Sequence, residues 1–168
     1  GSAGYAGVYL EDIDNDGDLD IVSASYADDT IAWFENDGNS NPSFSKVSIA
    51  TNADGAYDVY VADMDGDGDL DIVSASRYDD TVAWYENDGA ENPSFTAADI
   101  ATSADEVRDI HIADLDGDGD LDIVSASETD NTIAWYENDG AVNPTWTAAD
   151  IATSADNATG VHVADLDL

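Results

Sequence analysis

Apolar and polar positions alternate with a period of two along much of the chain, which is typical of β-strands and not of helices. One stretch shows the pattern well. Residues 59–62 alternate, residues 70–76 are β-branched at their centre, residues 81–86 contain an apolar run, and residues 94–100 follow a proline. Polar turns and an Asn-Asp-Gly segment, whose residues tolerate a positive φ, separate these runs. The pattern therefore predicts four short strands, of which the fourth is an outer strand or irregular edge.

The same pattern returns at a constant interval of 51 residues, with no insertion or deletion between copies. The chain therefore divides into a lead-in (1–7), three full repeats (8–58, 59–109 and 110–160) and a partial fourth repeat that holds only a first strand (161–168). Gly1 and Ser2 resemble the scar of a cleaved tag. Units of four strands at a period near 50 are typical of β-propeller blades. The sequence thus predicts an all-β fold of three blades, each with four antiparallel strands.

Charge narrows the classes of partner. The chain has 39 acidic and 3 basic residues and a formal net charge of -36, whereas 43% of its residues are hydrophobic and can supply a core. So acidic a chain repels itself when it is compact, unless bound cations or salt offset the charge. Nucleic acid and anionic lipid are excluded as partners because both need a basic face. No apolar run approaches the ~20 residues of a membrane span, so we expect no membrane insertion.

Each full repeat carries a nine-residue loop with aspartate at positions 1, 3, 5, 7 and 9 and glycine at position 6. Calcium takes roughly six to eight oxygen ligands, and a tight loop can direct alternate side chains toward one point. The glycine permits the bend that this requires. We expect carboxylate ligands from positions 1, 3, 5 and 9 and a backbone carbonyl from position 7. The candidate metal ligands are Asp12, Asp14, Asp16, Asp18, Asp20, Asp63, Asp65, Asp67, Asp69, Asp71, Asp114, Asp116, Asp118, Asp120 and Asp122.

Other interpretations of the loop are weaker. An EF-hand needs a bidentate glutamate at position 12, where this chain has Ser23, Ser74 or Ser125, and strand-forming residues follow instead of a helix. A solvated turn without an ion would leave four carboxylates in mutual repulsion. Magnesium prefers its own waters and strict octahedral geometry, and zinc would need thiols, whereas the chain has no cysteine. Calcium is therefore the predicted cofactor.

A catalytic role for the aspartates is also disfavoured. Glycoside hydrolysis needs a few carboxylates tuned differently from one another, whereas these clusters recur with the same surroundings. The repeats differ mainly at Arg77/Glu128, Tyr78/Thr129 and Glu106/Asn157, which form no catalytic set. We expect no enzyme and no catalytic residue.

One tryptophan recurs at the same strand position in each repeat, as Trp33, Trp84 and Trp135. A row of tryptophans could stack on sugars. Adjacent residues on a strand face opposite sides, however, and packing between neighbouring blades accounts for a large apolar residue at this position. We therefore expect the tryptophans to pack between blades.

Two motifs carry a resemblance to a known family. They are D-x-D-x-D-G-D-L-D-I-V-S-A-S and I/V-A-W-F/Y-E-N-D-G, and they extend over nearly the whole chain. At these residues the chain resembles the FG-GAP/VCBS repeats, the group that includes the integrin alpha-subunit propeller. The resemblance implies a propeller of roughly six to eight blades, with calcium between the first and second strands of a blade. The implied ligand carboxylates are Asp12, Asp14, Asp16 and Asp20 and their equivalents. Fungal lectins of related design suggest sugar binding.

Propellers of this family hold all their blades in one chain, whereas this chain has three, too few to close a ring. Exposed sheet faces and edges favour association, so we expect a homo-oligomer, with a dimer of six blades preferred.

The expected function is a calcium-stabilised scaffold or recognition module for adhesion or surface display, natural or a designed or excised propeller fragment, with a glycan or protein ligand. The alternatives are a lectin with sites between blades and, less favoured, a propeller lyase or hydrolase. Weak calcium affinity, on the order of 10⁻⁴ to 10⁻³ M, suits a secreted or cell-surface location.

Overall fold

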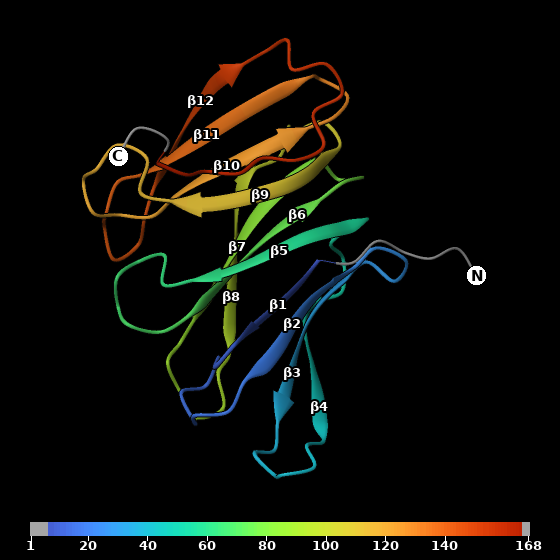
Figure 1. Cartoon of the computed structure of the whole chain (residues 1–168), viewed down its shortest axis with the longest axis vertical. Helices are drawn as coiled ribbons and strands as arrows, with labels where there is room; N and C mark the ends of the chain where they lie inside the picture. The colour runs from blue at the N-terminus through green and yellow to red at the C-terminus, as the bar shows by residue number, and fades with distance from the viewer. Residues whose placement is uncertain (1–6, 166–168) are drawn as a thin grey trace.

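A computed structural model describes residues 7–165, in which the repeats form three four-stranded antiparallel sheets (Figure 1). Sheet 1 contains β1 (Val8–Glu11), β2 (Asp20–Ser25), β3 (Thr30–Asn36) and β4 (Phe44–Ala50) in that order. Sheet 2 contains β5 (Ala56–Ala62), β6 (Asp71–Ser76), β7 (Thr81–Asn87) and β8 (Phe95–Ala101). Sheet 3 contains β9 (Val107–Ala113), β10 (Asp122–Ser127), β11 (Thr132–Asn138) and β12 (Trp146–Ala152). The all-β prediction is confirmed, and the sheets are consistent with propeller blades.

Tight turns join the second and third strands of each sheet. In sheet 2 the strands pair up to Ser76 opposite Thr81, and the last turn residue, Asp80, has a φ of 57°. Aspartate and asparagine tolerate this left-handed conformation better than most residues. Asp29 and Asn131 stand at the equivalent places with φ values of 55° and 58°. The turn chemistry therefore fixes the same register in every repeat.

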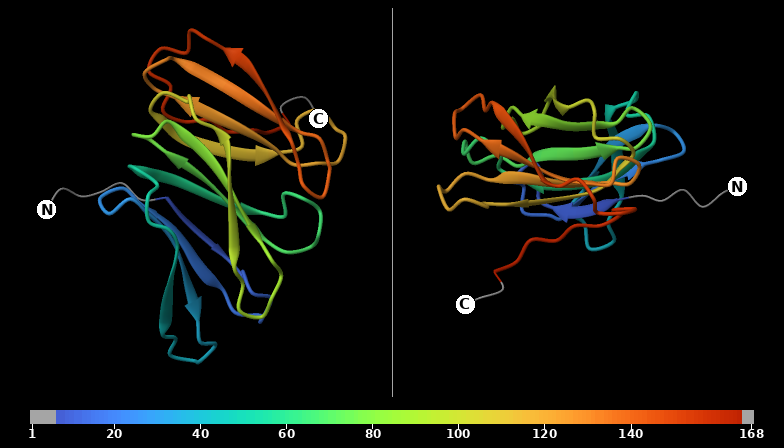
Figure 2. Two further views of the ribbon diagram at one scale, coloured as in Figure 1. Left: turned by 180° about the vertical axis from the view of Figure 1, so that it is seen from behind. Right: turned by 90° about the horizontal axis from the view of Figure 1, so that it is seen from above.

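The sheets pack face to face, with their first strands next to one another and their fourth strands on the outside (Figure 2). All six residues of β6 and of β10 are buried, whereas buried and half-buried residues alternate in β2. Sheet 1 has a neighbouring sheet on one face only, whereas sheet 2 lies between two sheets and residues 161–165 lie against the outer face of sheet 3. Trp33 and Trp84 are 3% and 5% exposed and belong to the two cores between sheets, which confirms the expected packing role for these two, whereas Trp135 is half-buried and belongs to neither core.

The repeat boundaries do not coincide with strand ends. β5 and β9 begin at Ala56 and Val107, ahead of the boundaries at 59 and 110. In the partial fourth repeat, residues 161–165 are described but form no strand. The tag scar and residues 166–168 lie outside the described residues. Within the described part of the chain, no helix is long and apolar enough to cross a membrane.

Candidate metal centres

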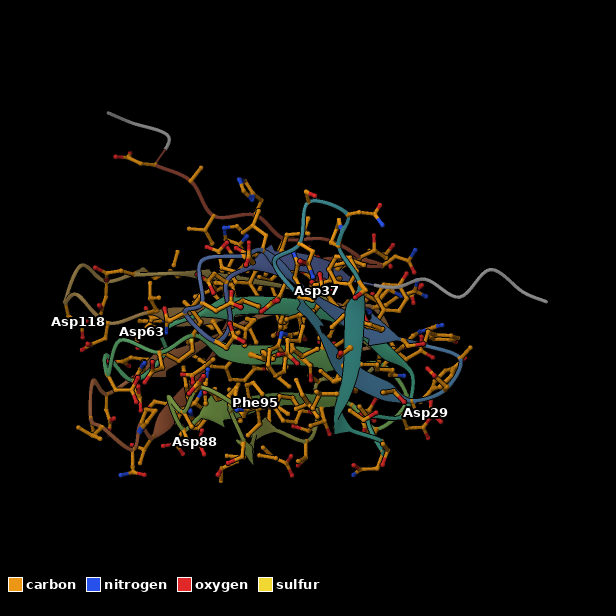
Figure 3. The ribbon with its side chains drawn as sticks, turned by 90° about the horizontal axis from the view of Figure 1, so that it is seen from below. Asp29, Asp37, Asp63, Asp88, Phe95 and Asp118 are labelled. Carbon is orange, nitrogen blue, oxygen red and sulfur yellow. The ribbon has the colours of Figure 1, made fainter. Side chains whose placement is uncertain are left out.

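The three aspartate loops connect the first and second strands of each sheet, β1 to β2, β5 to β6 and β9 to β10. The loop residues Asp63 and Asp118 lie at the same end of the molecule, and Asp29, in a turn between the second and third strands, lies at the other (Figure 3). The antiparallel order of the strands explains this arrangement, since consecutive connections alternate between the two ends of a sheet. All the aspartate loops therefore line one end.

Each loop gathers three carboxylates closely enough to share an ion. The groups are Asp12, Asp14 and Asp16; Asp63, Asp65 and Asp67; and Asp114, Asp116 and Asp122. In each group one oxygen from every residue lies within 4.8 Å of the others. Oxygens bound to one calcium at about 2.3–2.6 Å must lie within about 5.2 Å of one another. The donor set and its spacing therefore fit a hard divalent cation such as calcium.

Position 1 shapes the loop as well as contributing to the cluster. In the second loop, the carboxylate of Asp63 accepts backbone hydrogen bonds from Gly66 at 2.8 Å and Gly68 at 3.1 Å. Both glycines have a left-handed φ, of 74° and 98°, and this lets the backbone turn its N–H groups inward. Asp114 accepts the equivalent pair in the third loop, and Asp12 accepts from the N–H groups of Asp16 and Gly17, at positions 5 and 6, in the first. A carboxylate at position 1 thus holds the bend that brings positions 3 and 5 inward.

Position 9 has a second role that the sequence did not reveal. Asp71 is 1% exposed, and its two oxygens accept hydrogen bonds from the backbone N–H of Met64 at 3.1 Å and of Asn87 at 2.8 Å. Asp20 and Asp122 accept the same two bonds in their own repeats. This carboxylate therefore joins the loop to the end of the third strand. Only in the third loop does it also belong to the close cluster.

Position 7 directs its side chain elsewhere. The carboxylate of Asp69 lies against Gly89, so closely that a Cβ on that glycine would overlap it. It also accepts a hydrogen bond of 3.3 Å from the side chain of Asn15 in the neighbouring loop. Asp18 and Asp120 lie against Gly38 and Gly140 in the same way. The side chain at position 7 therefore contacts the turn between the third and fourth strands, as expected if only its carbonyl is offered to an ion.

Two asparagines connect neighbouring loops, although the sequence pattern predicts only that they lie in turns. The side-chain amide of Asn87 donates to the carbonyl of Leu70 at 3.0 Å in its own loop and to that of Ile13 at 3.2 Å in the loop of sheet 1. Asn138 makes the same pair of contacts, to Leu121 and to Met64 of sheet 2. The invariant spacing of this asparagine from the loop, 16 residues after position 9, was the available signal.

Burial and neighbouring charge make the clusters costly without a cation. Burial raises the pKa of the position-3 carboxyls Asp14, Asp65 and Asp116, and the charges of nearby aspartates raise it further. Burial also raises the pKa of Asp71 to about 7, against hydrogen bonds that lower it. A carboxylate that is reluctant to ionise is stabilised in its charged form when a cation lies beside it. The electrostatics therefore favour metal binding at these loops.

Comparison with models of known protein families identifies the family of the chain. It matches the FG-GAP-like repeat over residues 12–74, 63–125 and 114–168, which together cover every strand after β1. A search of curated proteins finds no match to the chain. Each matched range begins at position 1 of an aspartate loop, so the family resemblance and the carboxylate clusters rest on the same residues. The chain belongs to the FG-GAP-like repeat family.

Proposed function

We propose that this chain is a non-enzymatic, calcium-stabilised β-propeller scaffold or recognition module, in which each aspartate loop binds one calcium ion. The observation that carries the proposal is the carboxylate triad in each loop, with oxygens within 4.8 Å. Asp12, Asp63 and Asp114 would hold the ion together with the position-3 aspartates. Asp16 and Asp67 would join them in the first two loops, and Asp122 in the third. Members of this family are typically non-catalytic, which agrees with the recurrence of one site in every repeat.

Calcium would act on stability. The loops join strands of one sheet, and Asn87 and Asn138 connect each loop to its neighbour, so an ion in one loop supports two sheets. A ligand that binds only the folded state adds about 2.7 kcal/mol per site when it is present at 100-fold over its dissociation constant. The ions also offset part of the net charge of -36. The weak affinity typical of extracellular modules suits a secreted or cell-surface protein.

Titration calorimetry tests the proposal directly. We expect three calcium ions per chain, and two for the double variant Asp63→Asn/Asp65→Asn. The control Asp28→Asn/Asp54→Asn removes the same charge at exposed aspartates outside the loops and should still bind three. Thermal unfolding should show a higher Tm in CaCl₂ than in MgCl₂ or in NaCl of equal ionic strength. Calorimetry without heat, or equal stoichiometry in the two double variants, would overturn the proposal.

The second candidate function is a lectin, and a pocket that recurs between neighbouring sheets supports it. A pocket of about 370 Å³ lies between sheets 1 and 2 and is lined by Asn52, Asp79, Thr81, Tyr85 and Asp99, among others. The residues 51 positions later line a smaller pocket of about 110 Å³ between sheets 2 and 3. Hydroxyl, amide and carboxylate groups beside an aromatic ring are suited to a small polyhydroxylated ligand. The recurrence of the pocket supports sugar binding between blades.

Glycan-array binding separates the two candidates. A lectin should bind a defined sugar, lose it to free competitor, and lose it again in the variant Thr81→Val, which removes a hydroxyl from the pocket. Thr145→Val, on an exposed turn far along the chain, serves as the matched control. If the calcium-replete chain binds no glycan on the array, the lectin function is rejected and the scaffold function is retained.

A further inference from the structure

The contacts between neighbouring sheets recur from one junction to the next. At the junction of sheets 1 and 2, Ile31 and Trp33 of β3 belong to one buried cluster with Val59 and Val61 of β5. At the junction of sheets 2 and 3, the residues 51 positions later form the equivalent cluster: Val82, Trp84, Ile110 and Ile112. Each sheet thus has a front face that receives the next sheet and a back face that packs onto the previous one.

Among the described residues, no further sheet covers two such faces, the back of sheet 1 and the front of sheet 3. On the back of sheet 1, Val8 and Leu10 are 57% and 56% exposed, whereas the equivalent Val59 and Val61 are 3% and 4% exposed. On the front of sheet 3, Ile133 and Trp135 are half-buried, whereas their equivalents in sheets 1 and 2 are buried. These faces are the two halves of the interface that the chain forms twice internally. Their apolar residues are of the kind that interfaces cover.

We propose that the front of sheet 3 binds the back of sheet 1 of a second copy, head to tail, so that two copies close a ring of six sheets. Continuity with the two internal junctions identifies the occupant, because the second copy presents the residues that each internal front face already accepts. Closure by two copies covers both faces of both chains, whereas a single head-to-tail contact leaves one face of each chain open. Six blades lie within the usual range of propellers, roughly four to eight. The proposal concerns apolar faces and stands independently of calcium binding.

The segment after β12 already lies where the second copy would dock. The backbone N–H of Val161 donates to the carboxylate of Asp109 at 2.6 Å, as that of Ile110 does to Asp58 at 3.1 Å inside the chain. The ring of His162 packs on that of His111, with centroids 4.4 Å apart. Residues 161–165 thus occupy the position of a first strand on the front of sheet 3 (Figure 1).

We expect β1 of the second copy to displace residues 161–165 from the front of sheet 3. Residues 161–165 form no strand, whereas β1 is paired with β2 over four residues from Val8↔Ser23 to Glu11↔Asp20. An incoming sheet 1 therefore brings a first strand that is already hydrogen-bonded to its own sheet. The N–H of Val8 would then take the place of that of Val161 on Asp109. The segment acts as an intramolecular competitor that weakens, but does not prevent, association.

Light scattering after size-exclusion chromatography tests the proposal on the full 168-residue chain. We expect a discrete species of twice the chain mass that increases with protein concentration, both with calcium and with chelator, in about 0.5 M NaCl to screen the net charge. A chain that stays monomeric throughout, or that forms a ladder of larger species, overturns the closed pair. Failure to bind calcium in calorimetry would leave this result unaffected.

Substitutions locate the interface. Val8→Glu should abolish the dimer, while the control Val142→Glu, at a valine 70% exposed on an outer loop, should leave it unchanged. Val163→Gly loosens the competing segment and should lower the dimer dissociation constant several-fold. A dimer that survives Val8→Glu contradicts the proposed face. A dimer lost in Val163→Gly shows that the segment clasps the two copies together and contradicts its role as a competitor.

Discussion

Replacing aspartate by asparagine at position 3 or at position 9 of the same loop should affect the stability in chelator differently, because the two carboxylates have different contacts. Asp71 gives both oxygens to buried backbone N–H groups, of Met64 and Asn87, whose residues are each 2% exposed. Asp65 accepts one backbone bond, of 3.2 Å from Asp67, and belongs to the carboxylate cluster. An amide offers one acceptor where a carboxylate offers two. Asp71→Asn therefore leaves one buried donor without a partner, whereas Asp65→Asn does not.

The magnitude follows from these bonds. A buried donor left unsatisfied costs about 1–3 kcal/mol, so Asp71→Asn should lower the free energy of unfolding in chelator by up to that amount, offset in part by the cost of ionising the buried carboxylate, which the amide avoids. Asp65→Asn should leave stability in chelator unchanged or slightly higher, since it removes one charge from a repelling cluster. In CaCl₂ both variants should be less stable than the parent, Asp65→Asn because it loses a charged ligand.

Urea denaturation at about pH 8 measures both effects, because Asp71, with its pKa of about 7, is then mostly ionised in the folded chain. Measuring each variant in chelator and in CaCl₂ separates the effect of the substitution on the fold from its effect on calcium binding. A higher stability of Asp71→Asn than of the parent in chelator would refute the structural role of position 9. A larger loss for Asp65→Asn than for Asp71→Asn in chelator would refute the division of roles altogether.

Three other changes give distinct signatures. Gly89→Ala should cost more stability in urea than Gly66→Ala: both glycines have a left-handed φ, which costs about 1 kcal/mol for alanine, but only at Gly89 does the Cβ overlap a carboxylate. Burial raises the pKa of Asp58 to about 7, whereas in the unfolded chain this carboxyl loses its proton above about pH 4. The free energy of unfolding therefore falls as the pH rises from about 4 to about 7. Asp58→Asn should accordingly raise the Tm above neutral pH and leave it unchanged near pH 4, as a pH series of thermal melts would show. Arg77→Met removes a guanidinium paired with two glutamates and should cost about 1 kcal/mol at low salt, an effect that shrinks in concentrated NaCl if the pairing is ionic.

The sequence predicted the repeated elements because the causes of those elements are local. Period-two alternation, turn residues and the position-6 glycine act within a few residues, so the strands and the aspartate loops could be inferred in order. The fourth strand was harder, since its alanine-rich stretch has no clear period, but pairing with the third strand settles it as β4, β8 and β12. The clustering of positions 1, 3 and 5 in the first two loops followed from loop geometry alone.

The remaining features depend on contacts between residues distant in the chain. The hydrogen bond from Asn87 to Asp71 joins residues 16 apart in the chain. The bond from Asn87 to Ile13 joins residues 74 apart and connects sheet 2 to the loop of sheet 1. Local pattern carries no information about such partners. The departure of the third loop, where Asp122 takes the place of Asp118 in the close cluster, could not be anticipated because the three loop sequences are nearly identical.

Identity and variation among the repeats have different physical causes. The aspartate loops and their asparagine contacts recur at each junction, so every repeat needs the same residues there. The end of the molecule opposite the loops differs from junction to junction. Between sheets 1 and 2, the hydroxyl of Tyr26 bonds to that of Tyr78, whereas between sheets 2 and 3 the guanidinium of Arg77 pairs with Glu106 and Glu128. Arg77 also donates to the hydroxyl of Tyr26 at 3.5 Å, so the two junctions share this residue but offer it different partners. The varied end therefore distinguishes one junction from the next, while the constant end supplies the contacts that all of them share.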